Sequence, residues 1–367
     1  MKITFVLPVV GMSGGIRVIS IYADLLRKRG HEVTLVSPPR RKPSIRDRIR
    51  ALIRQRKFTG IQPRVSHLDS LGLDHRVIDR YRPIVDDDLP DADVVVATWW
   101  ETASWVLNLS PSKGKKAYFV QDYGAHEGQP LDAVAATWRY GLHMFTISAW
   151  LRGLMLEHTG FDDISFIPNS VDFCRFNSPE RDKQIRPTVG FLHDLRSQKG
   201  TTSILLALRS VHLRIPDLRV ISFGPHLPLE ALPEGSEFFH FADDHDLPSI
   251  YSRCDVWVFA STLEGFGLPI VEAMACRTPV VATPAGAAPQ LLKSGGGRLI
   301  PHGDPAAMAD AIVEILTLDS NDWRLLSRKA YDSVQGFTWE DATDMFEHQL
   351  QLALMGSDLP ARKLEVP

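Results

Sequence analysis

Two acidic side chains flank a glycine-rich turn in the second half of the sequence. Glu264 and Glu272 are separated by seven residues that begin Gly-Phe-Gly-Leu-Pro. Gly265 and Gly267 let the backbone approach a ligand closely, and Pro269 suits the first turn of a helix. The amides at such a helix start bind anions, above all a diphosphate, while the carboxylates can accept hydrogen bonds from hydroxyl groups. An open alternative is that Glu272 only complements the helix dipole and Glu264 is a loop charge.

Strands and helices must bring these residues to one edge of a sheet. Continuous runs of β-branched residues bounded by turns predict strands buried on both faces, as in parallel sheets. In the first half we expect a helix ending at Lys28 and strands at 3–10, 32–36, 93–97, 116–120, 144–147 and 165–167. In the second half we expect strands at 188–192, 218–223, 255–259 and 278–282, with helices at 201–214, ending at 253, around Glu272 and at 341–354.

The chain is predicted to be an α/β protein with two doubly wound domains. Its 367 residues exceed what a single core usually holds, and the polar stretch 177–183 is the best candidate for a linker. We predict a first domain at 1–177, a second at 178–338, and a C-terminal helix with its tail at 339–367. Parallel sheets bind ligands at the carboxyl ends of their strands, so the cleft between the domains is the expected site.

Glu264 and Glu272, with the Pro-Val-Val-Ala-Thr that follows at 279–283, resemble the E-x7-E signature of family 4 glycosyltransferases. Gly14-Gly15 with Arg17 is similar to that family's N-terminal glycine loop. Residues 169–172 (Asn-Ser-Val-Asp) resemble its Asn-Gly-Val-Asp turn, and Lys199-Gly200 its Lys-Gly pair. The resemblance implies a GT-B fold, with two Rossmann-like domains around a cleft and a C-terminal helix that returns to the first domain.

The resemblance also implies roles for the donor-binding residues. Glu264 would contact the transferred sugar of a nucleoside diphosphate sugar and act in catalysis, Glu272 would bind the ribose, and Lys199 would neutralise the diphosphate. The implied donor site further comprises Gly14, Gly15, Gly265, Phe266, Gly267 and Leu268, the last three through their amides.

This sequence departs from the family at a few positions. An arginine commonly follows the glycine of the strand before Lys199, whereas here Phe191 follows Gly190. Arg196, three residues before Lys199, is a candidate replacement that binds the donor diphosphate, although an exposed arginine is the competing interpretation. Arg277 stands where the family usually has glycine, and Gln290 where it commonly has glutamate.

The first domain is expected to bind the acceptor, a glycan or lipid-linked molecule. Trp99, Trp100, Gln121 and Tyr123 follow predicted strands and are the candidate acceptor-binding residues. Asp122 can orient or deprotonate an acceptor hydroxyl, and we predict a catalytic role for it. Many relatives have a histidine near this position; His126 is a candidate substitute, and the alternative is that it is an exposed loop histidine. The Gln-Asp-Tyr stretch resembles rhamnosyltransferase-like members, which hints at a deoxysugar donor.

The expected reaction retains the configuration of the sugar and uses no metal and no cofactor. The departing nucleoside diphosphate needs fixed positive charge, which Lys199 and the helix start can supply. The acidic runs 86–88 and 243–246 could be taken for a metal-binding Asp-x-Asp motif. Because the phosphates already have cationic and dipolar partners, we expect no metal site there.

Composition and charge exclude several classes of protein. The formal net charge of -3 argues against a dedicated nucleic-acid binder. Three cysteines without metal-ligand spacing, no signal-peptide pattern and no long apolar run together predict a cytoplasmic protein. The basic stretch 40–64 has an apolar face if it is helical, formed by Ile45, Ile49, Leu52 and Ile53. It predicts a peripheral contact with the inner face of a membrane, the alternative being a solvated loop.

Other functions remain open at this point. An NAD-dependent dehydrogenase fits poorly because the first turn, Gly11-Met-Ser-Gly-Gly15, is not GxGxxG and no acidic residue ends the second strand. A GT-B sugar-nucleotide epimerase or hydrolase would share the fold and the donor site. A non-catalytic carbohydrate-binding protein of the same fold is the third alternative.

Overall fold

The computed structural model describes residues 1–41, 66–69, 71–124, 130–161, 163–228 and 232–356. Its first half builds a seven-stranded parallel sheet in the order β3-β2-β1-β4-β5-β6-β7. The strands are β1 (Lys2–Val6), β2 (Glu32–Ser37), β3 (Asp74–Val77), β4 (Val94–Ala97), β5 (Lys115–Val120), β6 (His143–Thr146) and β7 (Ser165–Phe166). The predicted strand 3–10 stops at Val6 because Pro8 has no N–H to donate to a ladder.

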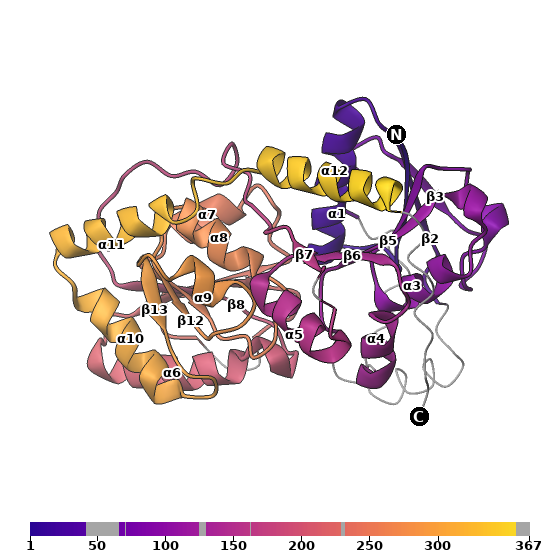
Figure 1. Cartoon of the computed structure of the whole chain (residues 1–367). Coiled ribbons are helices and arrows are strands. Elements are labelled where there is room, and N and C mark those ends of the chain that lie inside the picture. The colour runs from indigo at the N-terminus through magenta and orange to yellow at the C-terminus, as the bar shows by residue number, and fades with distance from the viewer. Residues whose placement is uncertain (42–65, 70, 125–129, 162, 229–231, 357–367) are drawn as a thin grey trace.

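Helices cover both faces of this sheet (Figure 1). They are α1 (Gly14–Lys28), α3 (Trp100–Leu107), α4 (Leu131–Thr137) and α5 (Ala149–Thr159), with short 3₁₀ turns at Asp86–Asp88 and Pro111–Lys113. Helix α1 begins where the Ser13 hydroxyl accepts a 3.4 Å hydrogen bond from the Ile16 amide, and it buries Ile19 and Tyr22. Its last turn carries Arg27 and Lys28, which suit the negative end of a helix.

The second half builds a six-stranded parallel sheet in the order β10-β9-β8-β11-β12-β13. Its strands are β8 (Thr188–Leu192), β9 (Arg219–Gly224), β10 (Glu237–His240), β11 (Val256–Phe259), β12 (Val280–Ala282) and β13 (Gly297–Leu299). Figure 1 shows helices on both faces, namely the 3₁₀ turn Ser197–Lys199, α6 (Thr201–Arg214), α7 (Leu247–Ser252), α8 (Leu268–Ala275), α9 (Ala288–Leu291), α10 (Pro305–Thr317) and α11 (Ser320–Asp332).

The last helix, α12 (Trp339–Met355), leaves the second sheet and packs against α1 and β5 of the first domain (Figure 1). It begins with a capping box in which Thr338 and Asp341 bond to each other's amides at 3.1 and 2.8 Å. The fully buried Phe346 ring lies 4.4 Å from the Tyr22 ring and 5.2 Å from the Phe119 ring. This apolar contact holds the helix on the first domain, and the predicted GT-B architecture is confirmed.

The chain passes between the domains twice, and the two passages are tied together. Between β7 and β8 the backbone is irregular, and the Ser170 hydroxyl donates a 2.6 Å hydrogen bond to the Phe337 carbonyl just before α12. The predicted linker packs on the second domain: Arg181 reaches the Thr278 hydroxyl at 2.9 Å, and Lys183 donates to the Leu318 carbonyl at 2.7 Å. The boundaries 1–177, 178–338 and 339–367 themselves stay predictions.

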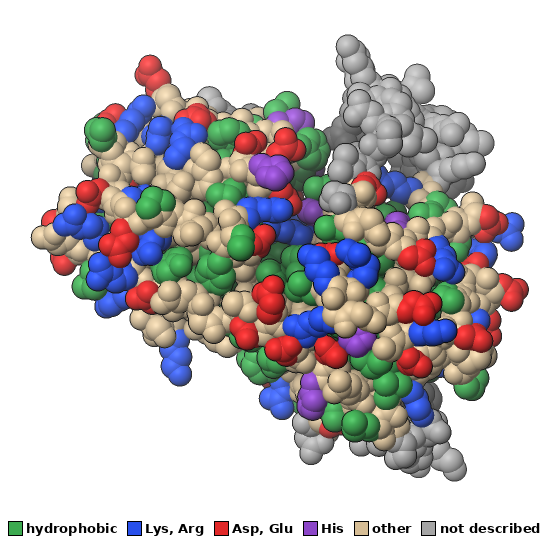
Figure 2. Space-filling model, turned by 90° about the horizontal axis from the view of Figure 1, so that it is seen from above, with side chains coloured by type: hydrophobic (Ala, Val, Ile, Leu, Met, Phe, Trp, Pro, Cys, Tyr) green, Lys and Arg blue, Asp and Glu red, His purple; other side chains and the backbone are tan. Residues whose placement is uncertain are grey.

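Within the described part of the chain, none of the helices combines the length and the apolar character needed to span a bilayer. The surface seen from above mixes basic and acidic side chains without a large field of one sign (Figure 2). Of the basic segment 40–64, only Arg40 and Arg41 belong to the described residues, and the predicted membrane contact at 42–64 lies outside them.

Candidate donor and acceptor site

The turn from Glu264 to Leu268 joins β11 to α8. Gly267 precedes the helix with φ +98°, a left-handed conformation that suits glycine, and the Phe259 ring lies where a side chain would project. The Ala287 amide fixes the turn by donating 2.8 Å to the Phe266 carbonyl. Among the described residues, the amides of Phe266, Gly267 and Leu268 donate no hydrogen bond. These N–H groups at a helix start form an arrangement that suits an anion.

Glu264 is paired with Lys199. The Lys199 ammonium contacts Glu264 Oε2, and the Ser261 hydroxyl lies 3.4 Å from the same oxygen. Both side chains are largely shielded, with 15% and 22% exposure. The loop after β8 reaches the end of β11 because Gly200, at φ +69°, packs too tightly on the Ala260 carbonyl for a side chain. Two neighbouring strand ends thus bring one cation and one carboxylate together.

Glu272 has hydrogen-bond partners in both domains. Arg17 of the first domain donates to Glu272 Oε1 at 2.7 Å, and Tyr251 of the second domain donates to Glu272 Oε2 at 2.7 Å. The Glu272 side chain is only 6% exposed. Burial and the charge of Glu272 both raise the pKa of the Tyr251 hydroxyl well above its usual value, so Tyr251 remains a donor at any physiological pH. Glu272 is therefore an acceptor shared by both domains.

The two domains touch along the glycine-bearing turns. Added side-chain atoms at Gly14 would lie 3.6 Å from the Leu268 side chain, and at Gly15 3.6 Å from the Gln121 amide. At Gly265 they would overlap the Gln121 carbonyl oxygen. The starts of α1 and α8 consequently lie side by side, because Gly14 faces Leu268 and, one turn on, Arg17 faces Glu272. The predicted donor residues of the two domains do converge on one place.

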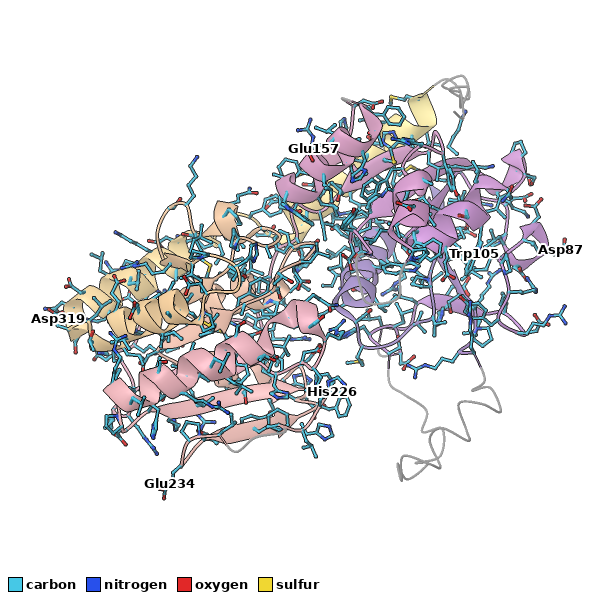
Figure 3. All side chains as sticks on the ribbon, turned by 90° about the horizontal axis from the view of Figure 1, so that it is seen from below. Asp87, Trp105, Glu157, His226, Glu234 and Asp319 are labelled. Atoms are coloured by element: carbon cyan, nitrogen blue, oxygen red, sulfur yellow. The ribbon has the colours of Figure 1, made fainter. Side chains whose placement is uncertain are left out.

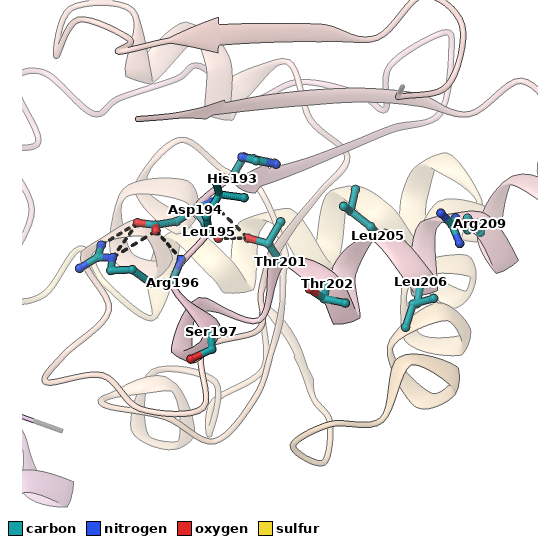
Figure 4. Close-up of a pocket in the computed structure, with 10 residues that line it drawn as sticks. All are labelled: His193, Asp194, Leu195, Arg196, Ser197, Thr201, Thr202, Leu205, Leu206 and Arg209. Atoms are coloured by element: carbon teal, nitrogen blue, oxygen red, sulfur yellow. Dashed lines mark hydrogen bonds and ion pairs between the residues drawn. The ribbon is translucent and has the colours of Figure 1, made fainter. Parts of the chain in front are cut away.

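Arg196 is bound to a carboxylate that the sequence did not single out. Its guanidinium donates to both oxygens of Asp194, at 2.6 Å to Oδ2 and 3.1 Å to Oδ1, and Asp194 is 2% exposed (Figure 4). The hydrogen bond to Asp194 raises the pKa of Arg196 against the opposing effect of burial, and the charges of Glu264 and Asp122 add to the rise. Carboxylates of both domains thus stabilise the charged form of Arg196.

A cavity of about 180 Å³ adjoins Arg196. Figure 4 shows its wall along the start of α6, where Thr201 bonds to Asp194 and Leu205 lies further along the helix. His226, which lies 4.0 Å from Asp194, is seen in Figure 3 at the end of the second domain that faces the first. The cavity therefore begins at the loop that carries Arg196, three residues before Lys199, and extends from there along α6.

The predicted acceptor residues occupy the carboxyl ends of β4 and β5. Trp99 and Trp100 begin α3, and both are half-buried. Gln121 lines the domain contact, and Asp122 follows it. The Tyr123 ring packs 5.7 Å from the Trp138 ring, so part of its surface is used inside the first domain. His126 lies outside the described residues. The roles assigned to these side chains stay predictions.

The acidic runs have basic partners. Asp88 binds Arg82 at 2.6 Å, and Asp244 binds Arg175 at 3.1 Å and lies 3.9 Å from His67. Across the described residues, no group of three or more potential ligands is placed to hold a metal ion.

Sequence reasoning missed Tyr251 and Asp194 and did not predict that Arg17 meets Glu272. Arg17 and Glu272 are 255 positions apart, and no local pattern encodes their contact. A signal for Asp194 did exist, since an acid two residues before Arg196 can pair with it across a turn.

Comparisons with known proteins find similarity to glycosyltransferases. Residues 186–318 match the family model Glycosyl transferases group 1. The O-antigen chain mannosyltransferase B of Escherichia coli is 34% identical over 107 residues, which cover 29% of this chain and 27% of that protein. The phosphatidyl-myo-inositol mannosyltransferase of Mycobacterium leprae is 32% identical over 206 residues, covering 53% of this chain and 54% of that protein. The matches thus span about half or less of these relatives.

Solved structures share the fold over nearly the whole chain. The sucrose-phosphate synthase of Thermosynechococcus elongatus has a TM-score of 0.72 at 18% identity and covers 97% of this chain and 100% of its own. Anabaena HepE, solved with UDP and glucose, has a TM-score of 0.69 at 17% identity over 96% of this chain and 100% of its own. The resemblance to glycosyltransferases is confirmed over 186–318, and the rhamnosyltransferase-like detail stays a prediction.

Proposed function

We propose that this protein, whose residues 186–318 match the group 1 glycosyl transferase family model, transfers a sugar from a nucleoside diphosphate sugar to a hydroxyl group of an acceptor. One observation supports this best. Glu264 and Glu272 flank a helix start whose first amides donate no hydrogen bond among the described residues, and each carboxylate meets a cation: Lys199 of the same domain contacts Glu264, and Arg17 of the first domain contacts Glu272. Carboxylates for hydroxyl groups and amides for a diphosphate are what a sugar nucleotide requires.

In the proposed complex the diphosphate lies at the start of α8. Within the described residues, the amides of Phe266, Gly267 and Leu268 donate no hydrogen bond, and they would donate to the diphosphate oxygens. Lys199 stands beside Glu264 and would balance the charge that grows on the leaving diphosphate. Glu264 would then bind hydroxyls of the transferred sugar, and Glu272 would bind the ribose. Asp122, from the first domain, would orient the acceptor hydroxyl and receive its proton.

We further propose that transfer retains the anomeric configuration, needs no metal ion or cofactor, and serves cell-surface polysaccharide synthesis at the cytoplasmic side of a membrane. Names of relatives support the kind of acceptor: one is an O-antigen chain mannosyltransferase and another a phosphatidyl-myo-inositol mannosyltransferase. The acceptor would accordingly be a glycan or a lipid-linked molecule.

The test begins with thermal-shift measurements of the protein against UDP, GDP, ADP and dTDP sugars. A ligand at 100 times its Kd should stabilise the fold by about 2.7 kcal/mol. Glu272→Gln should abolish this shift, while Arg214→Gln, on the exposed surface near Asp310, should keep it. The anomeric configuration of the product is then read by NMR, with and without EDTA. Donor turnover that ignores every acceptor would instead indicate an epimerase or a hydrolase, and a protein that binds no nucleotide would contradict the proposal.

A further inference from the structure

Glu272 has one partner in each domain, and the two partners occupy different oxygens. Arg17 donates to Oε1 and Tyr251 to Oε2, both at 2.7 Å. The Arg17 side chain is 15% exposed, and its guanidinium lies 5.4 Å from the Phe176 ring. Burial lowers the pKa of Arg17, but the charges of Glu272 and Asp244 outweigh it and raise the pKa overall. The pair is therefore a charged, shielded contact between the domains.

Two donors on a carboxylate fix its plane. A carboxylate has about four lone-pair sites, so two remain after Arg17 and Tyr251 have bound. Without Arg17 the group could rotate about its last bond or be solvated when the domains separate. With Arg17 in place, the remaining sites point in fixed directions, which is what recognition of two neighbouring hydroxyl groups requires.

We propose that Arg17 is a positioning residue for donor binding. From the first domain it fixes the orientation of the Glu272 carboxylate, which binds the ribose hydroxyls, and Tyr251 holds the same carboxylate from the second domain. This inference rests on the proposed function, because it takes Glu272 to bind the ribose. The new element is that Arg17 of the first domain affects donor binding indirectly, by holding Glu272, and does not itself contact the donor. Donor affinity then depends on the approach of the two domains.

The experiment compares two ligands on the full chain. The first is whichever of UDP, GDP, ADP and dTDP the wild type binds, and the second is its 2′,3′-dideoxy analogue, which lacks the ribose hydroxyls. Arg17→Met should raise the Kd of the first ligand about tenfold to a hundredfold, the effect of losing a hydrogen bond to a charged group. The Kd of the dideoxy analogue should change less than about twofold, since that ligand does not use Glu272.

Two further variants guard against a folding defect. Arg17→Lys keeps a cation and should recover most of the lost affinity. Tyr251→Phe keeps the Arg17–Glu272 charge pair and removes only the buried hydroxyl at Oε2, so it should weaken the first ligand in the same selective way. In turnover, the donor KM should rise in Arg17→Met while kcat stays within about threefold.

Three results would overturn the inference. Equal losses for both ligands would mean that Arg17 contacts the diphosphate or merely supports the fold. Unchanged binding of the first ligand in Arg17→Met and Tyr251→Phe would mean that Glu272 needs no positioning. If the wild type binds none of the nucleotides, the proposed function fails and the positioning role fails with it. The first two results would leave the proposed function intact.

Discussion

Gly265 lies where the two domains press together, and replacing it with alanine should separate activity from stability. An added methyl group would overlap the Gln121 carbonyl oxygen of the first domain and would lie 3.2 Å from the Ile147 side chain. The backbone of Gly265 is not left-handed, so alanine fits the turn itself. The overlap must be relieved by movement between the domains rather than by unfolding of either one.

The size of the effect follows from the geometry. To reach ordinary contact, the second domain must move back from the first by on the order of 1 Å. A misplacement of that size can reduce a reaction rate about a hundredfold. We therefore expect kcat/KM for sugar transfer to fall about a hundredfold in Gly265→Ala, while the Tm changes by only a few degrees.

Two glycine variants serve as controls. Gly153 lies inside α5 with no atom within 4 Å of an added methyl group, so Gly153→Ala should stabilise the fold by about 0.5–1 kcal/mol and leave activity unchanged. Gly190 packs against the Trp257 ring inside the second domain, so Gly190→Ala should lower the Tm strongly. The reasoning is refuted if Gly265→Ala transfers sugar at nearly the wild-type rate, or if its Tm falls as far as that of Gly190→Ala.

Three other predictions concern stability. Burial lowers the pKa of His143, and its 3.0 Å hydrogen bond to Gln349 of α12 offsets part of this effect. Because the unfolded chain then binds the proton more readily than the folded chain, stability should fall as the pH drops below about 6.5. The Tm of His143→Gln should therefore fall less than that of the wild type between pH 7.5 and 5.5. Equal losses would show that His143 does not contribute. Phe346→Ala should cost about 3–5 kcal/mol in denaturant unfolding, since the ring is fully buried among Tyr22 and Phe119; a cost below 1 kcal/mol would mean that α12 is not anchored there. Arg277 has φ +59°, so Arg277→Ala should be about 1 kcal/mol less stable than Arg277→Gly, and the reverse order would argue against backbone strain at this position.

The sequence predicted the central strands of both sheets and one edge strand, β7, and missed the other three edge strands. Strand β8 and helix α6 begin and end where they were expected, because apolar runs and helical spacing mark segments buried in a core. Strand β3 reads Asp-His-Arg-Val, is largely exposed and pairs on one side only, so no apolar pattern announces it. Strands β10 (Glu-Phe-Phe-His) and β13 (Gly-Arg-Leu) are the edges of the second sheet, and they were missed because each is short and has no continuous β-branched run.

The candidate site could be predicted as a set of residues but not as a network of contacts. The turn from Glu264 to Leu268 is a continuous segment, so its residue types and spacing indicate an anion site directly. The departure at Arg277 also has a local physical explanation: the position needs a left-handed backbone, for which glycine is the usual residue. By contrast, the partners of each carboxylate come from distant segments: Lys199 meets Glu264 across 65 positions, and Arg17 meets Glu272 across 255.

The contact between Arg17 and Glu272 also differs in kind from a stabilising core contact. A buried ion pair adds little net stability, because taking both charges out of water costs about as much as their attraction returns. Apolar packing of α12 already attaches the end of the second domain to the first domain, without the Arg17–Glu272 pair. An ion pair placed on the predicted ribose carboxylate is therefore better explained by specificity than by stability. Because Arg17→Met leaves the Glu272 carboxylate buried without its cation, it should also lower the free energy of unfolding by about 3–5 kcal/mol. Specificity is therefore read from the ratio of the two ligand affinities: Arg17→Met should weaken the nucleotide that carries ribose hydroxyls and not its dideoxy analogue, whereas Phe346→Ala should lower stability without this selectivity.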